Sequence, residues 1–536
     1  MIFKGEDVSE QEIEYDVAVV GYGPAGEVTA ATVGLAGHRV AVFERHRSAY
    51  PLPRMVTFDG EACRTVQATG ESIDQALSTA VVLDECNFGD ADAVPMLTLD
   101  WRGTQCGFPA HYSIFQPDVE ATLQANVDAQ PNVDVFRAHE VVELVQHDDH
   151  VELTVRPRDS EDDSVTRTVR ARYVVGADGT NSFVRQAAGI EMQDFGIHER
   201  WLNFDMDVHE RLEDKFQRLI MIMDPQRPHM YMPLGTTRHR FEIRIDDAES
   251  DEQMQDPQVA WDFLREAHGL GSDQLGICRQ AVYHYYTRVA VQWRKQRVFL
   301  AGDAAHTMTP YLGQGGCSAI RDGRNLGWKL ALVLSGAAED ALLDQYEVER
   351  SPHVTALVFT SHALAEMVNI VDAEAAAARN HAMRNHLTPP PPPFPKLEGG
   401  VLHTEADGSV SALTGSLSPQ GTLRRGGATG RGDDVLGHGF QLIVRHDPEL
   451  SATQQAVLDR IGCAVAVLDD PASPHAVEDV DGVYHAFLDS HGVDAYLTRP
   501  DWYVFGAGDA ASVGPLVDEL GQRLQLRAPR PAPTGV

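Results

Sequence analysis

Glycines and one carboxylate near the start of the chain have the spacing of a dinucleotide-binding turn. The segment Gly21-Tyr22-Gly23-Pro24-Ala25-Gly26 has the pattern GxGxxG, and Glu44 follows 18 residues after its last glycine. Glycines at these positions allow a tight turn and bring the backbone close to a pyrophosphate, whose charge is stabilised at a helix N-terminus. A carboxylate at the position of Glu44 can accept hydrogen bonds from a ribose. The pattern predicts that this segment binds a dinucleotide.

A second glycine-rich segment lies far along the chain. Gly302-Asp303-Ala304-Ala305-His306 is followed by Pro310-Tyr311-Leu312-Gly313-Gln314-Gly315-Gly316. The carboxylate of Asp303 can hold hydroxyl groups of a ligand, and glycines that open a helix direct N–H groups and the positive end of the helix dipole at an anion. A helix N-cap is the alternative role of Asp303. We interpret His306 as a buried structural histidine.

The apolar pattern predicts the elements that position these residues. Residues 15–20 and 39–43 are short apolar runs separated by a helix-length segment, which indicates a strand–helix–strand unit. Paired strands are expected over about 133–175, and antiparallel strands such as YMPLG and RFEIRI between about 190 and 295. A buried strand over 298–303 precedes a long helix. The proline run 388–395 cannot continue a helix, and new strands and helices follow beyond it.

Composition excludes several classes of function. The chain has 536 residues and a formal net charge of −35, which disfavours nucleic acid or a membrane surface as a partner. We expect no signal peptide, no membrane span and a cytoplasmic location. The six cysteines include no CxxC, which fits a reducing compartment and disfavours a zinc ribbon or disulfide scaffold. The 23 histidines include no HExxH pattern, so no metal is predicted.

Two motifs give the chain a resemblance to a known family. FLAGDAAHTMTPYLGQGGCSAIRDGRNLGWKLA resembles the GD motif of the para-hydroxybenzoate hydroxylase superfamily of flavoprotein monooxygenases, and VVGADGTNSFVRQ (174–186) resembles its DG motif. The resemblance covers roughly residues 15–360. It is nearest to the 3-(3-hydroxyphenyl)propionate hydroxylase and phenol hydroxylase branch, through stretches such as PLPRMVTFDGEACRT and MDPQRPHMYMPLGTTRHRFEIRI.

The resemblance implies a cofactor and a reaction. It implies non-covalent FAD, reduced by NADH or NADPH, and hydroxylation of a small phenolic ring by O₂ through a flavin C4a-hydroperoxide. The ring can belong to phenylpropionate-type catabolism or to the tailoring of an aromatic polyketide or other secondary metabolite. A homodimer is expected. The residues assigned to FAD are Gly21, Gly23, Pro24, Ala25, Gly26, Glu44, Arg45, Arg54, Gln116, Asp178, Gly302, Asp303, Pro310, Gly313, Gly315 and Gly316.

The same resemblance implies residues for the substrate. Arg240, Tyr231 and Glu242 are expected to face it, although Glu242 stands where phenol hydroxylase relatives have a tyrosine. Asp59 is expected to act as a base or acceptor for the phenolic proton, because a phenolate is more electron-rich than a phenol. The alternative for Asp59 is the N-cap of the next helix. Another departure is Gly316-Cys317-Ser318-Ala319, where the GD-motif helix of the family usually reads GQGxNSG.

The fold class expected is α/β with three parts. A Rossmann-like FAD-binding domain (1–190 and 296–388) contains an inserted antiparallel-sheet substrate domain (191–295, with parts of 75–115). A proline-rich linker (389–399) precedes a C-terminal thioredoxin-like α/β domain (400–536), expected to be redox-inert because Cys463 is its single cysteine. Two other functions stay open. One is a non-catalytic FAD-binding protein, and the other is a flavin-dependent halogenase, although the chain lacks the WxWxIP signature of halogenases.

Overall fold

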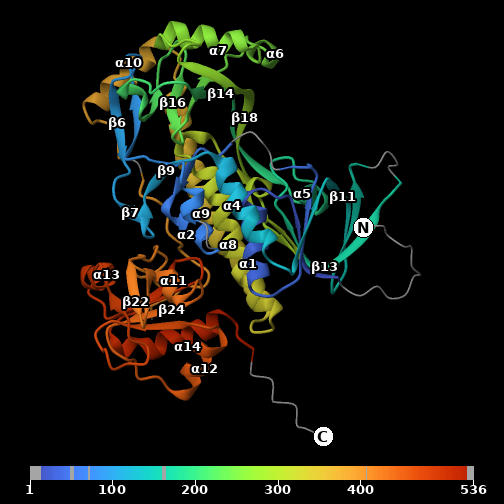
Figure 1. Cartoon of the computed structure of the whole chain (residues 1–536), viewed down its shortest axis with the longest axis vertical. Helices are drawn as coiled ribbons and strands as arrows, with labels where there is room; N and C mark the ends of the chain where they lie inside the picture. Colours follow the sequence, from blue (N-terminus) through green and yellow to red (C-terminus); the bar gives the residue numbers. More distant parts are fainter. Residues whose placement is uncertain are drawn as a thin grey trace.

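The computed structural model describes residues 14–48, 54–70, 73–159, 164–390, 392–405 and 407–527. Residues 1–13 lie outside this range, so the expectation that the N-terminal segment is not a signal peptide falls outside the described residues. Pro391 of the predicted linker also lies outside it. Three parts follow one another along the long axis, with a β-sheet domain at one end, a mixed α/β domain in the middle and the C-terminal domain at the other end (Figure 1). The predicted fold class is confirmed.

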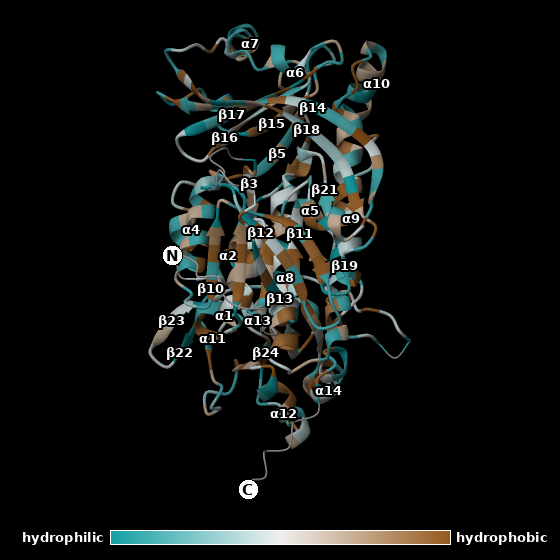
Figure 2. Ribbon diagram, turned by 90° about the vertical axis from the view of Figure 1, so that its right-hand side faces the viewer, coloured by the Kyte–Doolittle hydropathy of each residue, from teal (hydrophilic) through white to brown (hydrophobic). Residues whose placement is uncertain are grey.

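The central sheet of the middle part has the strand order β10-β2-β1-β13-β12-β11, with β20 beside β13 and β19 beside β20. Strands β1, β2, β10, β13 and β20 run parallel, whereas β11 and β12 are antiparallel additions. The strands are β1 Tyr15–Val20, β2 Val40–Glu44, β10 Val133–Arg137, β11 His139–Gln146, β12 Val151–Pro157, β13 Arg167–Gly176, β19 Arg294–Lys295 and β20 Val298–Leu300. The continuous apolar runs of β1, β2, β20 and the end of β13 fit strands covered on both faces, and Figure 2 shows brown colour along this sheet.

Helices α1 and α8 cover this sheet and pack closely on each other. A Cβ at Gly323 of α8 would lie 2.7 Å from the carbonyl oxygen of Ala25, and one at Gly327 would lie 2.8 Å from Thr32 Cβ. Small residues therefore set the distance between the two helices. The helices of this part are α1 Pro24–Leu35, α2 Gly60–Gln67, α3 Ile73–Ala76, α4 Gln116–Asp128, α5 Phe183–Ala187, α8 Gln314–Leu334 and α9 Gln345–Val368.

The second large sheet forms the wall above the central domain. Its order is β21-β18-β14-β17-β16-β15-β5-β6, and every neighbouring pair is antiparallel except β15 with β5. The strands are β5 Glu85–Gly89, β6 Pro95–Asp100, β14 Met192–Val208, β15 Leu219–Ile222, β16 His229–Leu234, β17 Arg238–Arg244, β18 Leu275–Ala290 and β21 His306–Thr307. Helices α6 Asp251–Met254 and α7 Pro257–Phe263 cover the outer face, and α10 Ala373–Arg384 lies at its edge (Figure 1).

The C-terminal domain is built on a four-stranded mixed sheet of order β25-β24-β27-β28. These strands are β24 Gln441–Val444, β25 Ala464–Val467, β27 Ala495–Thr498 and β28 Val504–Gly508, and the helices are α11 Gly432–Leu436, α12 Ala452–Arg460, α13 Val483–His491 and α14 Val513–Arg523. A small sheet of β22 Thr422–Arg425, β23 Ala428–Arg431 and β26 Glu478–Asp479 is added at one side. Ser451 and Gln454 form a capping box that fixes the start of α12.

Short strands connect the domains. β3 Thr57–Asp59, β9 His111–Ser113 and β4 Val81–Val82 form a three-stranded sheet, and β7 Thr104–Gln105 pairs with β8 Phe108–Pro109. Among the described helices, none is by itself long and apolar enough to cross a bilayer. The segments Asp340–Val368 and Ala373–Arg384 pass that test together by length and composition, with a bend of 119° between them.

Candidate active site

A cavity of about 900 Å³ lies between the central sheet and the second sheet. Its floor is formed where strands of the central sheet end, by Gly21 after β1, Glu44 at the end of β2, Asp178 after β13 and Ala301 after β20. The carboxyl edge of parallel strands is the usual place for a ligand in an open α/β sheet. The opposite wall comes from the inner face of β16, β17 and β18.

The GxGxxG turn forms a cradle with three different glycine roles. Gly21 has φ +100°, and a Cβ there would lie 2.3 Å from the Ala177 carbonyl oxygen. A Cβ at Gly26 would lie 2.1 Å from the Gly21 carbonyl oxygen, so Gly26 serves packing and does not line the cavity. Gly23 lines the cavity, and a Cβ there would meet no atom within 4 Å. The space beside Gly23 therefore belongs to a ligand, and no side chain caps the N-terminus of α1 there.

Glu44 and Gln116 hold the loops around this cradle. The Glu44 carboxylate accepts hydrogen bonds from the backbone N–H groups of Tyr22 (2.9 Å) and His46 (2.8 Å). Gln116 Oε1 accepts from the backbone N–H groups of Arg54 and Met55, both at 2.7 Å. Glu44 and Gln116 line the cavity. Both side chains thus orient the backbone beside the predicted dinucleotide.

The second glycine-rich segment closes the opposite side of the cradle. Gly313 has φ +63°, and a Cβ there would lie 1.9 Å from Thr57 Oγ1, so this turn needs glycine. It begins α8, whose N-terminus has no side-chain cap and points its free N–H groups at the cavity wall made by Gly315 and Gly316. Asp303 lines the same wall and accepts a hydrogen bond from Thr180 Oγ1 at 3.3 Å.

The residues assigned to FAD are therefore brought together from five separate stretches of sequence, around residues 21–26, 44–54, 116, 178 and 302–316. Fifteen of the sixteen line one cavity: Gly21, Gly23, Pro24, Ala25, Glu44, Arg45, Arg54, Gln116, Asp178, Gly302, Asp303, Pro310, Gly313, Gly315 and Gly316. Two uncapped helix N-termini suit a pyrophosphate and an anionic ring, and carboxylates suit ribose and ribityl hydroxyls. This donor and acceptor set fits FAD.

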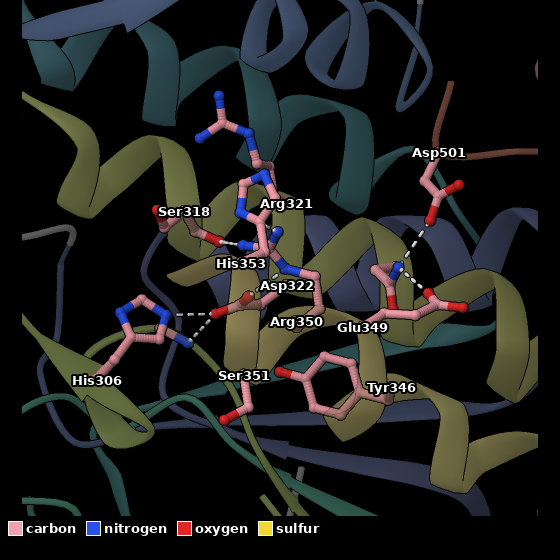
Figure 3. A network of polar contacts seen from close by, with 12 residues as sticks. His306, Ser318, Arg321, Asp322, Tyr346, Glu349, Arg350, Ser351, His353 and Asp501 are labelled. Atoms are coloured by element: carbon pink, nitrogen blue, oxygen red, sulfur yellow. Dashed lines mark hydrogen bonds and ion pairs between the residues drawn. The ribbon is translucent and has the colours of Figure 1, made fainter. Parts of the chain in front are cut away.

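Behind the cradle, a buried polar row supports the turn at Asp303. His306 Nε2 donates to Asp322 Oδ2 at 2.6 Å, and the Gly302 N–H donates to the same oxygen at 3.0 Å. Arg350 Nε donates to the other oxygen of Asp322 at 2.9 Å, as Figure 3 shows. His306 also lines the cavity. The row fixes the glycine-rich turn to α8 and α9.

The part of the cavity beside the second sheet, which we call the chamber, is lined on β16 and β17 by alternate side chains. On β17, Arg240 and Glu242 line the cavity, while Phe241 packs on the outer face. On β16, Met230 and Met232 line the cavity, while Tyr231 packs between Phe216 and Phe241 on the outer face. Tyr231 is therefore not brought to the cavity. Successive side chains point to opposite faces of a strand, so Tyr231 cannot share the face of its neighbours.

Several lining residues carry no signal in the sequence that could have identified them. β18 contributes Tyr283 and Tyr285, and the apolar part of the chamber includes Phe88, Trp101 and Met221. For Met230 and Met232, the alternation around the predicted strand YMPLG was a usable signal, but the expectation that Tyr231 faces the substrate assigned these methionines to the opposite face. The other residues reach the chamber only through pairing of distant strands.

Charges in the chamber are arranged around Arg240. Asp205 of β14 accepts from Arg240 Nε (2.7 Å) and Nη2 (2.9 Å), and all but 1% of each side chain is buried. Arg279 Nη1 also donates to Asp205 at 3.2 Å. Burial raises the pKa of Glu242 to about 7, although the nearby Arg240 lowers it. The chamber thus contains an Arg240–Asp205 pair and a carboxyl that titrates near neutral pH.

Asp59 lies away from the chamber. It caps α2 by accepting from the Ala62 N–H at 2.9 Å, and its other oxygen pairs with Arg321 of α8. Asp59 is not among the described residues that line the cavity, and both of its oxygens are engaged. The structure thus agrees with the N-cap alternative and gives no support to substrate contact. Burial acts to raise the pKa of Asp59, but Arg321, His111 and the hydrogen bonds that Asp59 accepts together hold it below its ordinary value.

Outside the cavity, one group of residues has metal-ligand chemistry. His147, His150 and Glu152 lie together on the β11–β12 hairpin. Glu152 is already paired with Arg170 at 2.7 Å, and none of the three lines the cavity. All six cysteines are free thiols, so the described structure contains no disulfide.

Comparisons with known proteins agree with this geometry. Residues 14–361 match the family described as FAD binding domain, and residues 415–523 match the HcaD C-terminal domain. A probable NADH-specific resorcinol 4-hydroxylase of Rhodococcus jostii is 35% identical over 97% of both chains. A 3-(3-hydroxy-phenyl)propionate/3-hydroxycinnamic acid hydroxylase of Mycobacterium sp. is 32% identical over 92% of this chain and 89% of the relative. The crystal structure of the flavin-dependent monooxygenase PieE with FAD and substrate has a TM-score of 0.78, with 19% identity and coverage of 95% of this chain and 99% of that chain, which shows the shared fold.

Proposed function

The chain belongs to the family of FAD-dependent aromatic-ring hydroxylases, and from that premise we propose that it hydroxylates a single small phenolic ring of the resorcinol type. It is an FAD-dependent monooxygenase, and a nicotinamide supplies the electrons. A halogenase and a non-catalytic FAD-binding protein are disfavoured by this membership.

One observation carries the choice of a small ring. The same cavity of about 900 Å³ has to hold the dinucleotide and the substrate, and cavities of this size commonly hold one drug-sized ligand. After FAD occupies the glycine-lined half, the part between Met230, Met232 and Tyr285 is left for the substrate. This favours one ring over the polycyclic substrates of polyketide tailoring.

The residues of this chain bind and orient the reactants. Backbone N–H groups at the starts of α1 and α8 would hold the anionic parts of FAD, and Asp303 and Glu44 would hold its hydroxyls. Bound FAD supplies the transfer of two electrons from the nicotinamide and the activation of O₂. The apolar walls of Met232 and Trp101 exclude water from the ring. The overall reaction joins a phenol, NAD(P)H, H⁺ and O₂ to give the hydroxylated phenol, NAD(P)⁺ and water.

Two finer assignments belong to the same proposal. NADH is proposed as the reductant, because the name of the resorcinol 4-hydroxylase relative specifies NADH. A homodimer and a cytoplasmic location stay predictions, the latter supported by six cysteines without a disulfide.

The experiment is a substrate screen on purified protein. We expect a yellow protein with about one FAD per chain, whose NADH oxidation rises when resorcinol is added and which forms a hydroxylated product. Asp303→Ala is expected to lose FAD on gel filtration, with Asp273→Ala, in a loop of the sheet domain outside the cavity, as the control. Wild-type protein that binds no FAD, or binds it but oxygenates no phenol, contradicts the proposal.

A further inference from the structure

The inner face of β17 presents an open carboxyl oxygen to the substrate chamber. Glu242 Oε1 accepts from Asn203 Nδ2 at 2.8 Å and lies 3.6 Å from Arg240 Nη1. Among the described residues, none donates a hydrogen bond to Glu242 Oε2, although Glu242 lines the cavity. An acceptor that stays unpaired in a buried chamber suits a donor on a ligand.

The hydroxyl of Tyr285 on β18 complements this acceptor. Asn203 Nδ2 also donates to Tyr285 Oη at 3.1 Å, so one amide holds both side chains in place. Because Tyr285 Oη accepts from Asn203, its own hydrogen is directed elsewhere, and Tyr285 lines the cavity. The chamber therefore offers an acceptor on β17 and a donor on β18, the two strands on either side of β14, which matches a hydroxyl group that both donates and accepts.

Arg240 does not make the chamber a binding site for an anionic substrate. Two of its nitrogens are engaged by Asp205, and a third donates to the Arg54 carbonyl at 3.3 Å. A substrate carboxylate in this chamber would meet the negative charge of ionised Glu242 at low dielectric, where repulsion between like charges is strong, while the charge of Arg240 is already paired with Asp205. An uncharged ring with hydroxyl groups meets no such penalty.

We propose that Glu242 is the specificity-determining residue of this chain, which accepts the proton of a ring hydroxyl and selects uncharged hydroxylated benzenes against phenols that carry a carboxylate. This inference rests on the proposed function and names its substrate class. The accepted proton stays on Glu242 Oε2 while the ring oxygen gains negative charge, so the electron-rich ring is formed in place. No further reactant is needed for this step.

The pH range of this selection follows from the surroundings of Glu242. The charged or titratable groups nearest to it are Arg240 on its own strand, Asp205 on β14, Arg279 and Tyr285 on β18, and Tyr311 after β21. Burial is the largest influence and raises the pKa of Glu242 to about 7. Acceptance of a proton needs the ionised form, so hydroxyl binding strengthens as the pH rises from 6 to 8.

The test measures binding to the oxidised FAD-loaded enzyme without NADH. Dissociation constants for resorcinol and for 3-(3-hydroxyphenyl)propionate are obtained from flavin absorbance changes at pH 6, 7 and 8. We expect the wild type to favour resorcinol at least tenfold at pH 8, with a preference that falls toward pH 6. In Glu242→Gln, the preference should fall below threefold and become independent of pH.

Glu199→Gln serves as the matched control. Glu199 is a carboxyl of the same sheet whose pKa burial also raises, and it does not line the cavity. The Glu199→Gln variant should keep the wild-type preference for resorcinol. Equal binding of both ligands by the wild type, or an unchanged preference in Glu242→Gln with normal FAD content, overturns the role of Glu242 and leaves the proposed function intact. Failure of all phenols to bind or to be oxygenated would instead count against the proposed function. If Glu242→Gln does not fold, the pH dependence of the wild-type preference decides alone.

Discussion

Arg64 of α2 and Asp433 of the C-terminal domain form a two-pronged ion pair, with Nε–Oδ2 at 2.6 Å and Nη2–Oδ1 at 2.7 Å. At most 1% of either side chain is exposed. A second buried pair joins Arg499 to Glu349 of α9, at 2.9 and 2.6 Å. At this contact, Asn325 Nδ2 of α8 donates to both Glu349 and Asp501, at 2.8 and 2.7 Å.

Removal of the C-terminal domain is therefore expected to destabilise the remaining chain. A truncation after Pro389 leaves Arg64 and Glu349 without Asp433 and Arg499, and breaking a buried pair costs about 3–5 kcal/mol. We expect a strong loss of soluble, FAD-loaded protein, measured by gel filtration and flavin absorbance. Arg424→Ala, at an exposed pair of the same domain, is the control. A truncated chain with wild-type melting temperature and FAD content would contradict this account.

The roles of the second and third glycines of GxGxxG, Gly23 and Gly26, are separable by substitution. Gly23→Ala is expected to weaken FAD binding at least tenfold with little change in apoprotein stability, since its Cβ enters the open cavity. Gly26→Ala is expected to destabilise the apoprotein itself, because its Cβ would lie 2.1 Å from the Gly21 carbonyl oxygen. Thermal unfolding of apoprotein and titration with FAD distinguish the two. Equal effects of both variants on apoprotein stability would show that Gly23 does not border ligand space.

Asp59 offers a test between a structural and a chemical role. Asp59→Ala removes the cap of α2 and leaves buried Arg321 with Glu61 alone as its carboxylate partner. We expect a stability loss of at least about 1 kcal/mol from the cap, more from the charge, and an unchanged yield of product per NADH. The yield and H₂O₂ formation are measured at a temperature well below unfolding. Normal stability together with wasted oxygen would instead support Asp59 as the proton acceptor.

The raised pKa of Glu242 also predicts that the stability of the fold depends on pH. Its pKa is about 7 in the folded chain against an ordinary value of 4.5, so between these values the folded state binds more protons than the unfolded state. Stability conferred by the protonated carboxyl is thus lost as the pH rises from 4.5 to 7. Glu242→Gln should gain up to about 3 kcal/mol relative to wild type on going from pH 4.5 to 8. Chemical denaturation at several pH values measures this gain, and a constant difference between the two proteins would reject it.

The sequence predicted the flavin cradle well because its motifs are local. GxGxxG and the turn at Gly313 each place their own backbone through glycine conformations, and the strands and helices around them have continuous apolar patterns. The meeting of Asp178 with Asp303 in one cavity was implied only by the resemblance to a family.

The substrate chamber was less predictable because it depends on strand phase and on distant pairs. Tyr231 was placed on the wrong face, since a shift of one residue reverses which side chains face the cavity. Arg321 meets Asp59 from a helix more than 250 positions later, and Tyr285 reaches Glu242 only through β14. No local pattern contains such information.

The buried pairs between α2, α9 and the C-terminal domain have a consequence for how this chain can evolve. The proline run 388–395 would be an obvious place for recombination to exchange the C-terminal domain. However, Leu397 directly after it is fully buried, and each buried ion pair has one member on either side of the run. A crossover there would bring together partners that had not been selected together, and unmatched buried charges would penalise most recombinants. The two halves are therefore expected to be inherited as one unit, and substitutions at Arg64 or Glu349 to be accompanied by compensating changes at Asp433 or Arg499.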